Sequence, residues 1–168
     1  TDDSAIGANE LGLFQLDSYP SMTPVQIAAR RSKVLDWLKG GTNTAPRSEW
    51  GAPVHSSPVM IGYQEDANNE LVSSIFVSTN EGYLHAIDTG EPTKGSAALD
   101  VANRGGKELF SFIPKETLTN AAVLEENAEG DPIYGLDLTW SYWRDGGGDT
   151  TNSQGSDDHV YIYGGMRR

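Results

Sequence analysis

Residues 75–90 read IFVSTNEGYLHAIDTG, and this stretch decides the class of fold. Its first part predicts one strand and YLHAID predicts a second, with the turn TNEG (79–82) between them. Asn80 and Gly82 tolerate the positive backbone φ that a tight connection needs. The stretch therefore predicts an antiparallel β-hairpin.

Short β-rich runs continue on both sides of this hairpin. They are SPVMIGY (57–63), ELFSFI (108–113), IYGLDLTWSYW (133–143) and HVYIY (159–163). The composition agrees with a β protein rich in turns, because the chain of 168 residues holds 19 glycines and 8 prolines. We therefore expect a mainly β fold.

The clearest helical signal begins at Thr23. This residue is a suitable N-cap, Pro24 suits the first helical position, and Gln26 completes a capping box. Apolar residues then recur at helical spacing until two adjacent glycines provide a stop. The sequence predicts one N-terminal α-helix at about residues 24–39.

The chain changes character near residue 52. Residues 42–51 (TNTAPRSEWG) have the composition of a linker, and helical periodicity disappears after them. The apolar patch LGLFQL (11–16) is either an edge strand or a docking segment. We expect an N-terminal segment with helix and linker at 1–51 and the β part at 52–168.

Composition also excludes several classes of function. The formal net charge of −12 would repel nucleic acid and anionic lipid heads, although in its simplest interpretation it only keeps the chain soluble. The absence of cysteine excludes disulfides, thiolate zinc sites and a cysteine nucleophile. No apolar run approaches the roughly 20 residues of a membrane span.

The order of the β-rich runs is typical of one blade of a β-propeller. A strand, a glycine turn and a second strand are followed by DTG (88–90) and a further strand that contains aromatic residues. A single blade exposes both of its faces, so neighbouring blades must cover them. The sequence contains one clear blade and one or two partial blades.

More specific motifs occur in the same order along the chain. They are VLDWLKG (34–40), HSSPVMIG (55–62), IFVSTNEGYLHAID (75–88), LFSFIPK (109–115) and VYIYGGMRR (160–168). Together they resemble the start of the C-terminal quinoprotein-like β-propeller domain of the PilY/PilC family of type IV pilus tip adhesins and biogenesis factors. The resemblance covers roughly residues 33–168. It implies a partial quinoprotein-like β-propeller that begins after the N-terminal α-helix.

This resemblance implies a non-enzymatic, exported protein at the cell surface, the pilus tip or the outer membrane. Its partners would be minor pilins or other pilus proteins and a host or abiotic surface, and calcium would regulate pilus extension and retraction. The family's calcium loop lies downstream of the position of Arg168, so that site is not transferred to this chain. We expect a fragment, a partly resolved chain, or a piece completed by the remaining propeller blades or by other copies.

The best metal candidate within the chain is the loop DGGGDTTNSQGSDD (145–158). Its carboxylates are hard oxygen ligands of the kind that calcium prefers, on a backbone made flexible by glycine. The candidate ligands are Asp145, Asp149, Asp157 and Asp158. Their spacing is not that of an EF-hand, so a solvated loop is the simpler interpretation.

No catalytic constellation is readable from the sequence. The stretch His55-Ser56-Ser57 lacks the G-x-S-x-G elbow of a serine hydrolase, and we interpret its hydroxyls as structural. His85 and His159 show no zinc-protease spacing, and we expect a histidine such as His85 to be hydrogen-bonded.

The remaining cluster is aromatic and is expected to fill contacts between blades. It comprises Trp140, Tyr142, Trp143, Tyr161 and Tyr163. Two other functions stay open. The chain is alternatively a fragment of a pyrroloquinoline-quinone-dependent dehydrogenase, which shares the generic blade motif, or a subunit of an extracellular filament whose sheet is closed by neighbouring chains.

Overall fold

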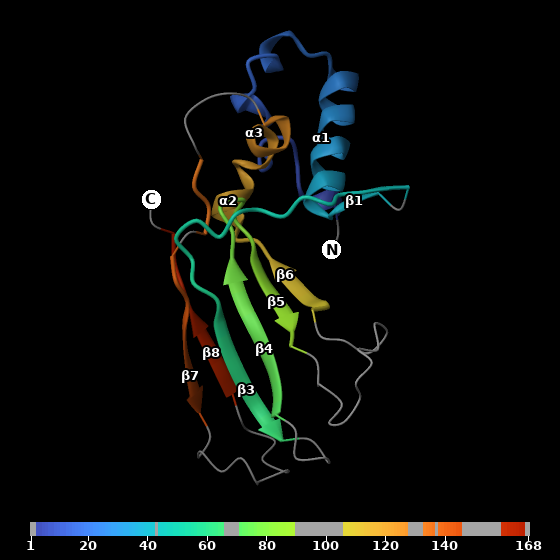
Figure 1. Cartoon of the computed structure of the whole chain (residues 1–168). Coiled ribbons are helices and arrows are strands. Elements are labelled where there is room, and N and C mark those ends of the chain that lie inside the picture. Colours follow the sequence, from blue (N-terminus) through green and yellow to red (C-terminus); the bar gives the residue numbers. More distant parts are fainter. Residues whose placement is uncertain are drawn as a thin grey trace.

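The computed structural model describes residues 3–42, 44–65, 71–89, 106–127, 133–136, 138–145 and 159–166. The fold is mainly β, with several antiparallel sheets and a few helices. The helices gather at one end of the molecule and the longer strands extend away from them (Figure 1). None of the helices among these residues is long and apolar enough to cross a membrane.

The N-terminal part consists of three short 3₁₀ helices and one long α-helix. They are η1 (Asp3–Ala5), η2 (Leu13–Gln15), η3 (Tyr19–Ser21) and α1 (Pro24–Leu38). The patch at 11–16 is a docking segment and not an edge strand, because Leu11, Leu13 and Leu16 are buried against Val34 of α1.

Helix α1 confirms the helix predicted from its capping signals. The Thr23 backbone N–H donates to Gln26 Oε1 at 2.8 Å, and Thr23 Oγ1 accepts from the Gln26 N–H at 3.4 Å. This reciprocal pair satisfies two backbone N–H groups, those of Thr23 and Gln26, at the helix start. The helix ends at Leu38, within a residue of the predicted end, and Gly40 follows with a φ of 87°.

Two further helices correct the prediction of a single helix. Helix α2 (Lys115–Leu118) and helix α3 (Ala121–Glu126) follow the fourth strand of the main sheet. Helix α3 ends at Glu126, and its C-cap Asn127 has a left-handed φ of 49°. It packs on α1 and η2, so residues far apart in sequence build the helical core together.

The main sheet is a four-stranded antiparallel meander in the order β3-β4-β5-β6. Its strands are β3 (Val59–Glu65), β4 (Leu71–Ser78), β5 (Leu84–Asp88) and β6 (Glu108–Phe112). The hairpin predicted from the opening stretch is confirmed as β4 and β5, with Phe76 opposite Ala86. Gly82 takes a φ of 93° in the turn, whereas Asn80 does not need a positive φ.

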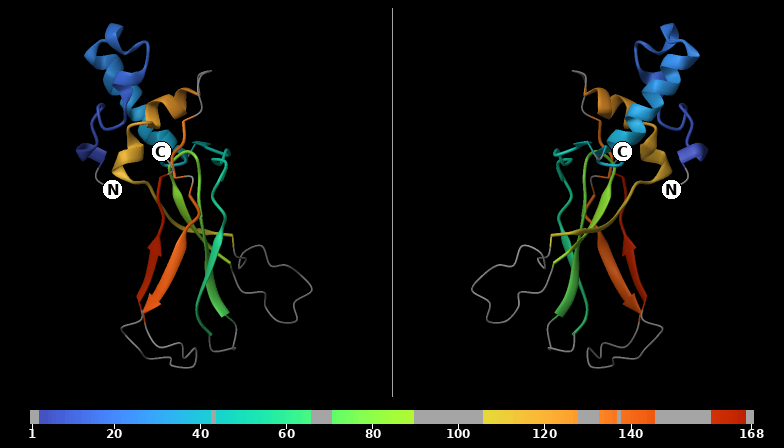
Figure 2. Two further views of the ribbon diagram at one scale, coloured as in Figure 1. Left: turned by 90° about the vertical axis from the view of Figure 1, so that its left-hand side faces the viewer. Right: turned by 90° about the vertical axis from the view of Figure 1, so that its right-hand side faces the viewer.

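Two smaller sheets accompany this meander. The linker forms a short ribbon from β1 (Gly41–Thr42) and β2 (Ala45–Pro46). The other sheet is the hairpin β7 (Ser141–Asp145) and β8 (His159–Tyr163). Val160 and Ile162 of β8 pack on a core that includes Ile61 and Phe76, so the hairpin forms a second layer on one face of the meander (Figure 2).

The strand predicted at 133–143 is wrong over most of its length. Only its last residues belong to β7, and the described residues before Ser141 lie outside any strand. The Gly135 N–H donates to Asn80 O at 2.9 Å, and a Cβ on Gly135 would lie 2.4 Å from Gly82 N. This segment therefore packs against the β4–β5 turn instead of entering a ladder.

Candidate functional site

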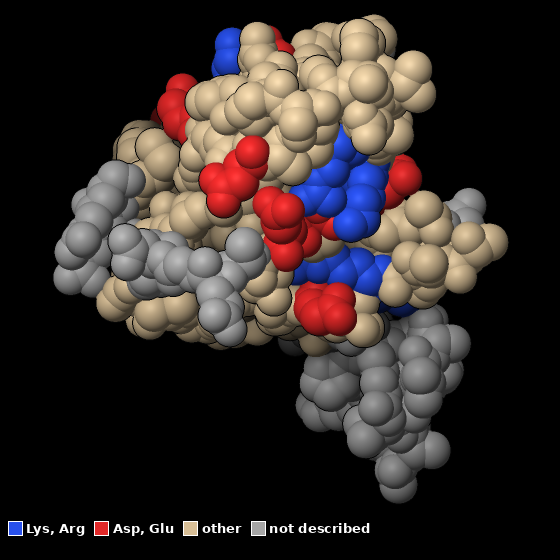
Figure 3. Space-filling model, turned by 90° about the horizontal axis from the view of Figure 1, so that it is seen from above, with Lys and Arg blue, Asp and Glu red and all other residues tan. Residues whose placement is uncertain are grey.

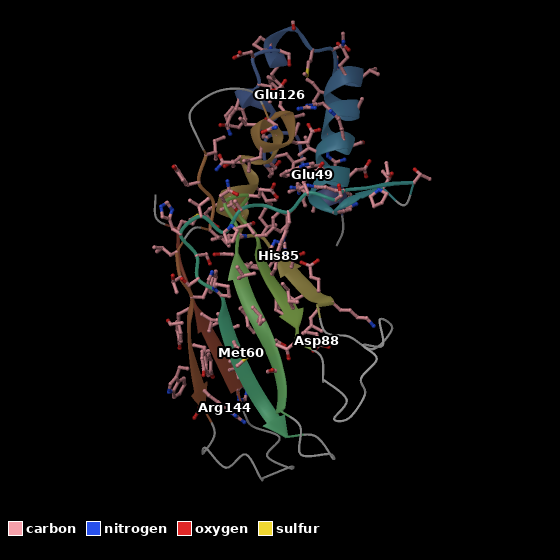
Figure 4. The ribbon with its side chains drawn as sticks, viewed as in Figure 1. Glu49, Met60, His85, Asp88, Glu126 and Arg144 are labelled. Carbon is pink, nitrogen blue, oxygen red and sulfur yellow. The ribbon has the colours of Figure 1, made fainter. Side chains whose placement is uncertain are left out.

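A cavity of about 430 Å³ lies where the linker crosses the helical end of the meander. Its walls come from the end of α1 and the residues after it, from the linker, from the β4–β5 turn, and from β5 and β6. Figure 4 shows His85 at the end of the sheet that faces the helices, with Glu49 of the linker above it. The cavity is therefore bounded by the contact between the two parts of the molecule.

His85 is the centre of the polar network in this cavity. Its Nδ1 lies 2.6 Å from Glu108 Oε1, and its Nε2 accepts from Trp50 Nε1 at 2.8 Å. An indole nitrogen is only a donor, so Nε2 must carry a lone pair and the imidazole proton must sit on Nδ1. The geometry thus defines a neutral His85 that donates to Glu108 and accepts from Trp50.

The rings around His85 complete its environment. Its ring stacks on Tyr83 with centroids 5.5 Å apart, and the Trp50 ring meets it edge-on at 5.0 Å. The Tyr83 hydroxyl donates to Leu38 O at 2.7 Å. Burial raises the pKa of Tyr83 well above its usual value, while the nearby Arg47 opposes that rise. Tyr83 therefore stays protonated and serves as a donor.

A second connection ties the linker to the β4–β5 turn. Arg47 forms an ion pair with Glu81, and its guanidinium lies 4.2 Å from the centre of the Trp37 ring. A planar guanidinium suits this combination of ion pair and cation–π contact. We call the two connections, Arg47 with Glu81 and Trp50 with His85 and Glu108, the linker clasp.

The linker clasp holds the linker on the sheet through both nitrogens of His85. A general base needs a free lone pair within reach of a substrate proton. The Nε2 lone pair of His85 is already occupied by the Trp50 N–H, and Nδ1 faces Glu108. The hydrogen-bonded role predicted for His85 is thus confirmed.

The predicted calcium loop falls mainly outside the described residues. Asp145 is exposed at the end of β7, where it pairs in register with His159. Asp149, Asp157 and Asp158 lie outside the residues that the structure describes. Within the described ranges, no group of three or more His, Asp or Glu side chains is placed to hold a metal ion.

The serine motif plays the structural role expected of it. Ser56 is buried, and its Oγ accepts from the Ser78 backbone N–H at 3.2 Å. Ser57 is exposed, and its N–H donates to Thr139 Oγ1 at 3.4 Å. The HSS stretch therefore fastens the start of the meander to the end of β4.

The predicted aromatic cluster divides into a partly buried and an exposed part. Trp140 packs on the core of the meander, and a Cβ on Gly164 would lie 2.3 Å from its ring. On the other face of the hairpin, Trp143 stacks on Tyr161 with ring centroids 5.4 Å apart. We call this outward surface the aromatic face; it comprises Trp143, His159, Tyr161 and Tyr163.

Exposure decides how the aromatic face is interpreted. Trp143 is 53% exposed, Tyr161 43% and Tyr163 54%, although such side chains ordinarily find partners in a folded protein. Phe110 and Phe112 on β6 are also about half exposed. Trp140 fills a contact between the hairpin segment and the meander, whereas a role of the cluster in contacts between blades stays a prediction.

The helical end of the molecule carries both basic and acidic side chains. Seen from above, basic and acidic side chains lie beside one another there (Figure 3). Arg30 and Lys33 of α1 both contact Glu125 of α3, at 2.6 and 2.9 Å. These two ion pairs join α1 to α3.

Fold and site together define a mainly β protein in which two sheets pack face to face and a linker fastens a helical end to them. No family model, curated protein or solved structure matches this chain.

Proposed function

We propose that this chain is a non-enzymatic binding and assembly module of a type IV pilus tip, exported to the cell surface. The starting point is the ordered set of motifs that resembles the PilY/PilC family. The observation that carries the proposal furthest is the aromatic face, because it leaves a second sheet layer open on its outer side.

The arrangement of sheets is compatible with the start of a β-propeller. In that interpretation the meander is one blade and the hairpin β7–β8 is the inner half of the next blade. The hairpin's inner residues Val160 and Ile162 cover one face of the meander, as successive blades cover one another. Its outer face would then receive further propeller blades or another chain.

Two of the family-like motifs have physical roles that suit such stacking. Ser56 of HSSPV joins the entry of the first sheet to Ser78. Gly164 of YIYGGMRR leaves room for the Trp140 ring between the layers. Both residues act where one sheet meets the next segment of chain. The resemblance is therefore supported by the contacts that these residues make, in addition to their identity in the sequence.

The aromatic face also suits a protein partner such as a minor pilin. Trp and Tyr are enriched in protein interfaces because they offer large rigid contact areas. Trp143 and Tyr161 lie on a hairpin whose inner face is anchored to the core, so their positions are fixed before a partner arrives. A prearranged surface loses less side-chain entropy on binding.

Binding to purified minor pilin ectodomains tests this proposal. We expect measurable binding by interferometry, weakened at least about tenfold by Trp143→Ala combined with Tyr161→Ala. Phe14→Ala is the matched control, because Phe14 is an exposed aromatic residue at the helical end. Absence of binding to every minor pilin, or equal loss in the control, would contradict the proposal.

Two further measurements test its other parts. Sustained dye reduction with pyrroloquinoline quinone and an alcohol would overturn the non-enzymatic assignment in favour of a dehydrogenase. Calorimetry with millimolar calcium tests the ligands proposed in the loop, Asp145, Asp149, Asp157 and Asp158; no heat above that of a chelator control would end the calcium part.

A further inference from the structure

The Trp50 half of the linker clasp depends on the protonation state of one imidazole. Trp50 is 56% exposed, so burial holds its ring only weakly and the hydrogen bond to His85 Nε2 matters more. That bond exists only while Nε2 carries a lone pair. In this geometry the imidazole proton is on Nδ1, where it faces Glu108.

Adding a proton to His85 changes the two bonds in opposite directions. The new N–H at Nε2 would point at the Trp50 N–H, so two donors would face each other and the bond would be lost. The bond from Nδ1 to Glu108 would become a charge-assisted pair and would keep the imidazolium in place. Protonation therefore acts selectively on the linker side.

We propose that the linker clasp is a pH-sensitive strap, in which protonation of His85 releases Trp50 and opens the cavity beneath the linker. Acidification is the trigger, because a proton on Nε2 removes the lone pair that accepts from Trp50. It goes beyond the proposed function and does not depend on it.

The other charged groups around His85 leave this selectivity intact. From β6 the carboxylate of Glu108 faces His85, and from β4 its register partner is the apolar Val77. Tyr83 remains neutral because burial raises its pKa. The remaining charged residues that line the cavity are Lys39 after α1, Arg47 and Glu49 of the linker, and Glu81 of the turn.

Arg47 sets how far the strap opens. Its ion pair with Glu81 and its position over Trp37 do not involve His85. The linker therefore stays fastened at Arg47 while the Trp50 end is released.

Proton NMR of the full chain tests the strap directly. The Trp50 indole N–H signal is assigned by its loss in Trp50→Phe. We expect this signal to move in a single transition as the pH falls, together with the His85 ring signals, and its protection from solvent exchange to fall about fivefold. His55→Gln is the matched control and should leave the transition unchanged, because His55 lies outside the clasp.

His85→Gln separates the switch from the fold. A glutamine amide offers one donor and one acceptor, as neutral His85 does, but it does not titrate. We expect the Trp50 signal in this variant to be independent of pH. A constant Trp50 signal in the unmodified chain while His85 titrates, or a transition that persists in His85→Gln, would overturn the proposal.

A stability comparison with Trp50→Phe serves if His85→Gln does not fold. The unmodified chain should be more stable than Trp50→Phe at a pH above the His85 transition seen by NMR, and the difference should vanish at a pH below it, because the bond is absent from both proteins there. An equal difference at the two pH values would contradict the strap.

Discussion

At the scale of single residues, buried hydrogen bonds explain why the HSSPV motif contributes to the fold. Ser56 Oγ satisfies the Ser78 N–H inside the protein. In Ser56→Ala this amide would lose its partner, which costs about 1–3 kcal/mol of the free energy of unfolding. Urea denaturation measures the loss, and Ser57→Ala at an exposed neighbour should stay within about 0.5 kcal/mol of the unmodified chain.

A second prediction at this scale concerns the glycine beside Trp140. A Cβ at Gly164 would lie 2.3 Å from that ring, which anchors the hairpin on the meander. We expect Gly164→Ala to lower the free energy of unfolding by about 1–3 kcal/mol, since the ring must shift. At Gly165 the nearest atom is a flexible leucine methyl group at 3.3 Å, so Gly165→Ala should cost less in the same denaturation experiment.

At the scale of elements, one carboxylate joins helices that are far apart in sequence. The side chain of Glu125 on α3 is 6% exposed and lies 2.6 Å from Arg30 and 2.9 Å from Lys33. Glu125→Gln removes the charge and leaves the partly buried Arg30 without its counter-ion. We therefore expect the free energy of unfolding to fall by about 1–3 kcal/mol. Thermal unfolding measures it, with the exposed Glu126→Gln as the matched control.

Elements with local signals could be predicted from the sequence. The α1 capping box and the glycine turn at Gly82 act over a few residues, so their positions follow from residue type. Strand β8 coincides with the predicted run at 159–163. Local chemistry thus located the elements whose boundaries depend on their own residues.

Elements decided by distant contacts could not be predicted in the same way. Helix α3 has no side-chain N-cap, and its two alanines are buried by contact with Leu11 and α1. The segment around Gly135 has the composition of a strand, but the Gly135 N–H donates to Asn80 O in the β4–β5 turn and not to a neighbouring strand. Asn127 at the end of AAVLEEN was the available signal for α3, since asparagine tolerates a left-handed C-cap.

The candidate site depends almost wholly on tertiary contacts. Trp50 and His85 are 35 residues apart, and no spacing rule relates an indole in a linker to an imidazole on a strand. The sequence indicated only that His85 would be hydrogen-bonded. The partners, the tautomer and the linker clasp follow from how the linker crosses the sheet.

At the scale of the whole molecule, charge and the aromatic face oppose each other. A formal net charge of −12 keeps copies of the chain apart, whereas Trp143 and Tyr161 offer an apolar surface that would be buried by association. Raising the salt concentration from about 0.01 to about 0.15 M shortens the screening length from about 30 to about 8 Å. Salt should therefore favour association through the aromatic face.

Sedimentation over a dilution series checks this balance. We expect self-association to increase with salt in the unmodified chain and to be lost in Trp143→Ser combined with Tyr161→Ser, with little change in stability because both side chains are about half exposed. Phe14→Ser removes an exposed aromatic residue from the helical end and should associate as the unmodified chain does. If the double variant also associates normally, the aromatic face does not bring the copies together, and another exposed surface, such as β6 with Phe110 and Phe112, must account for it.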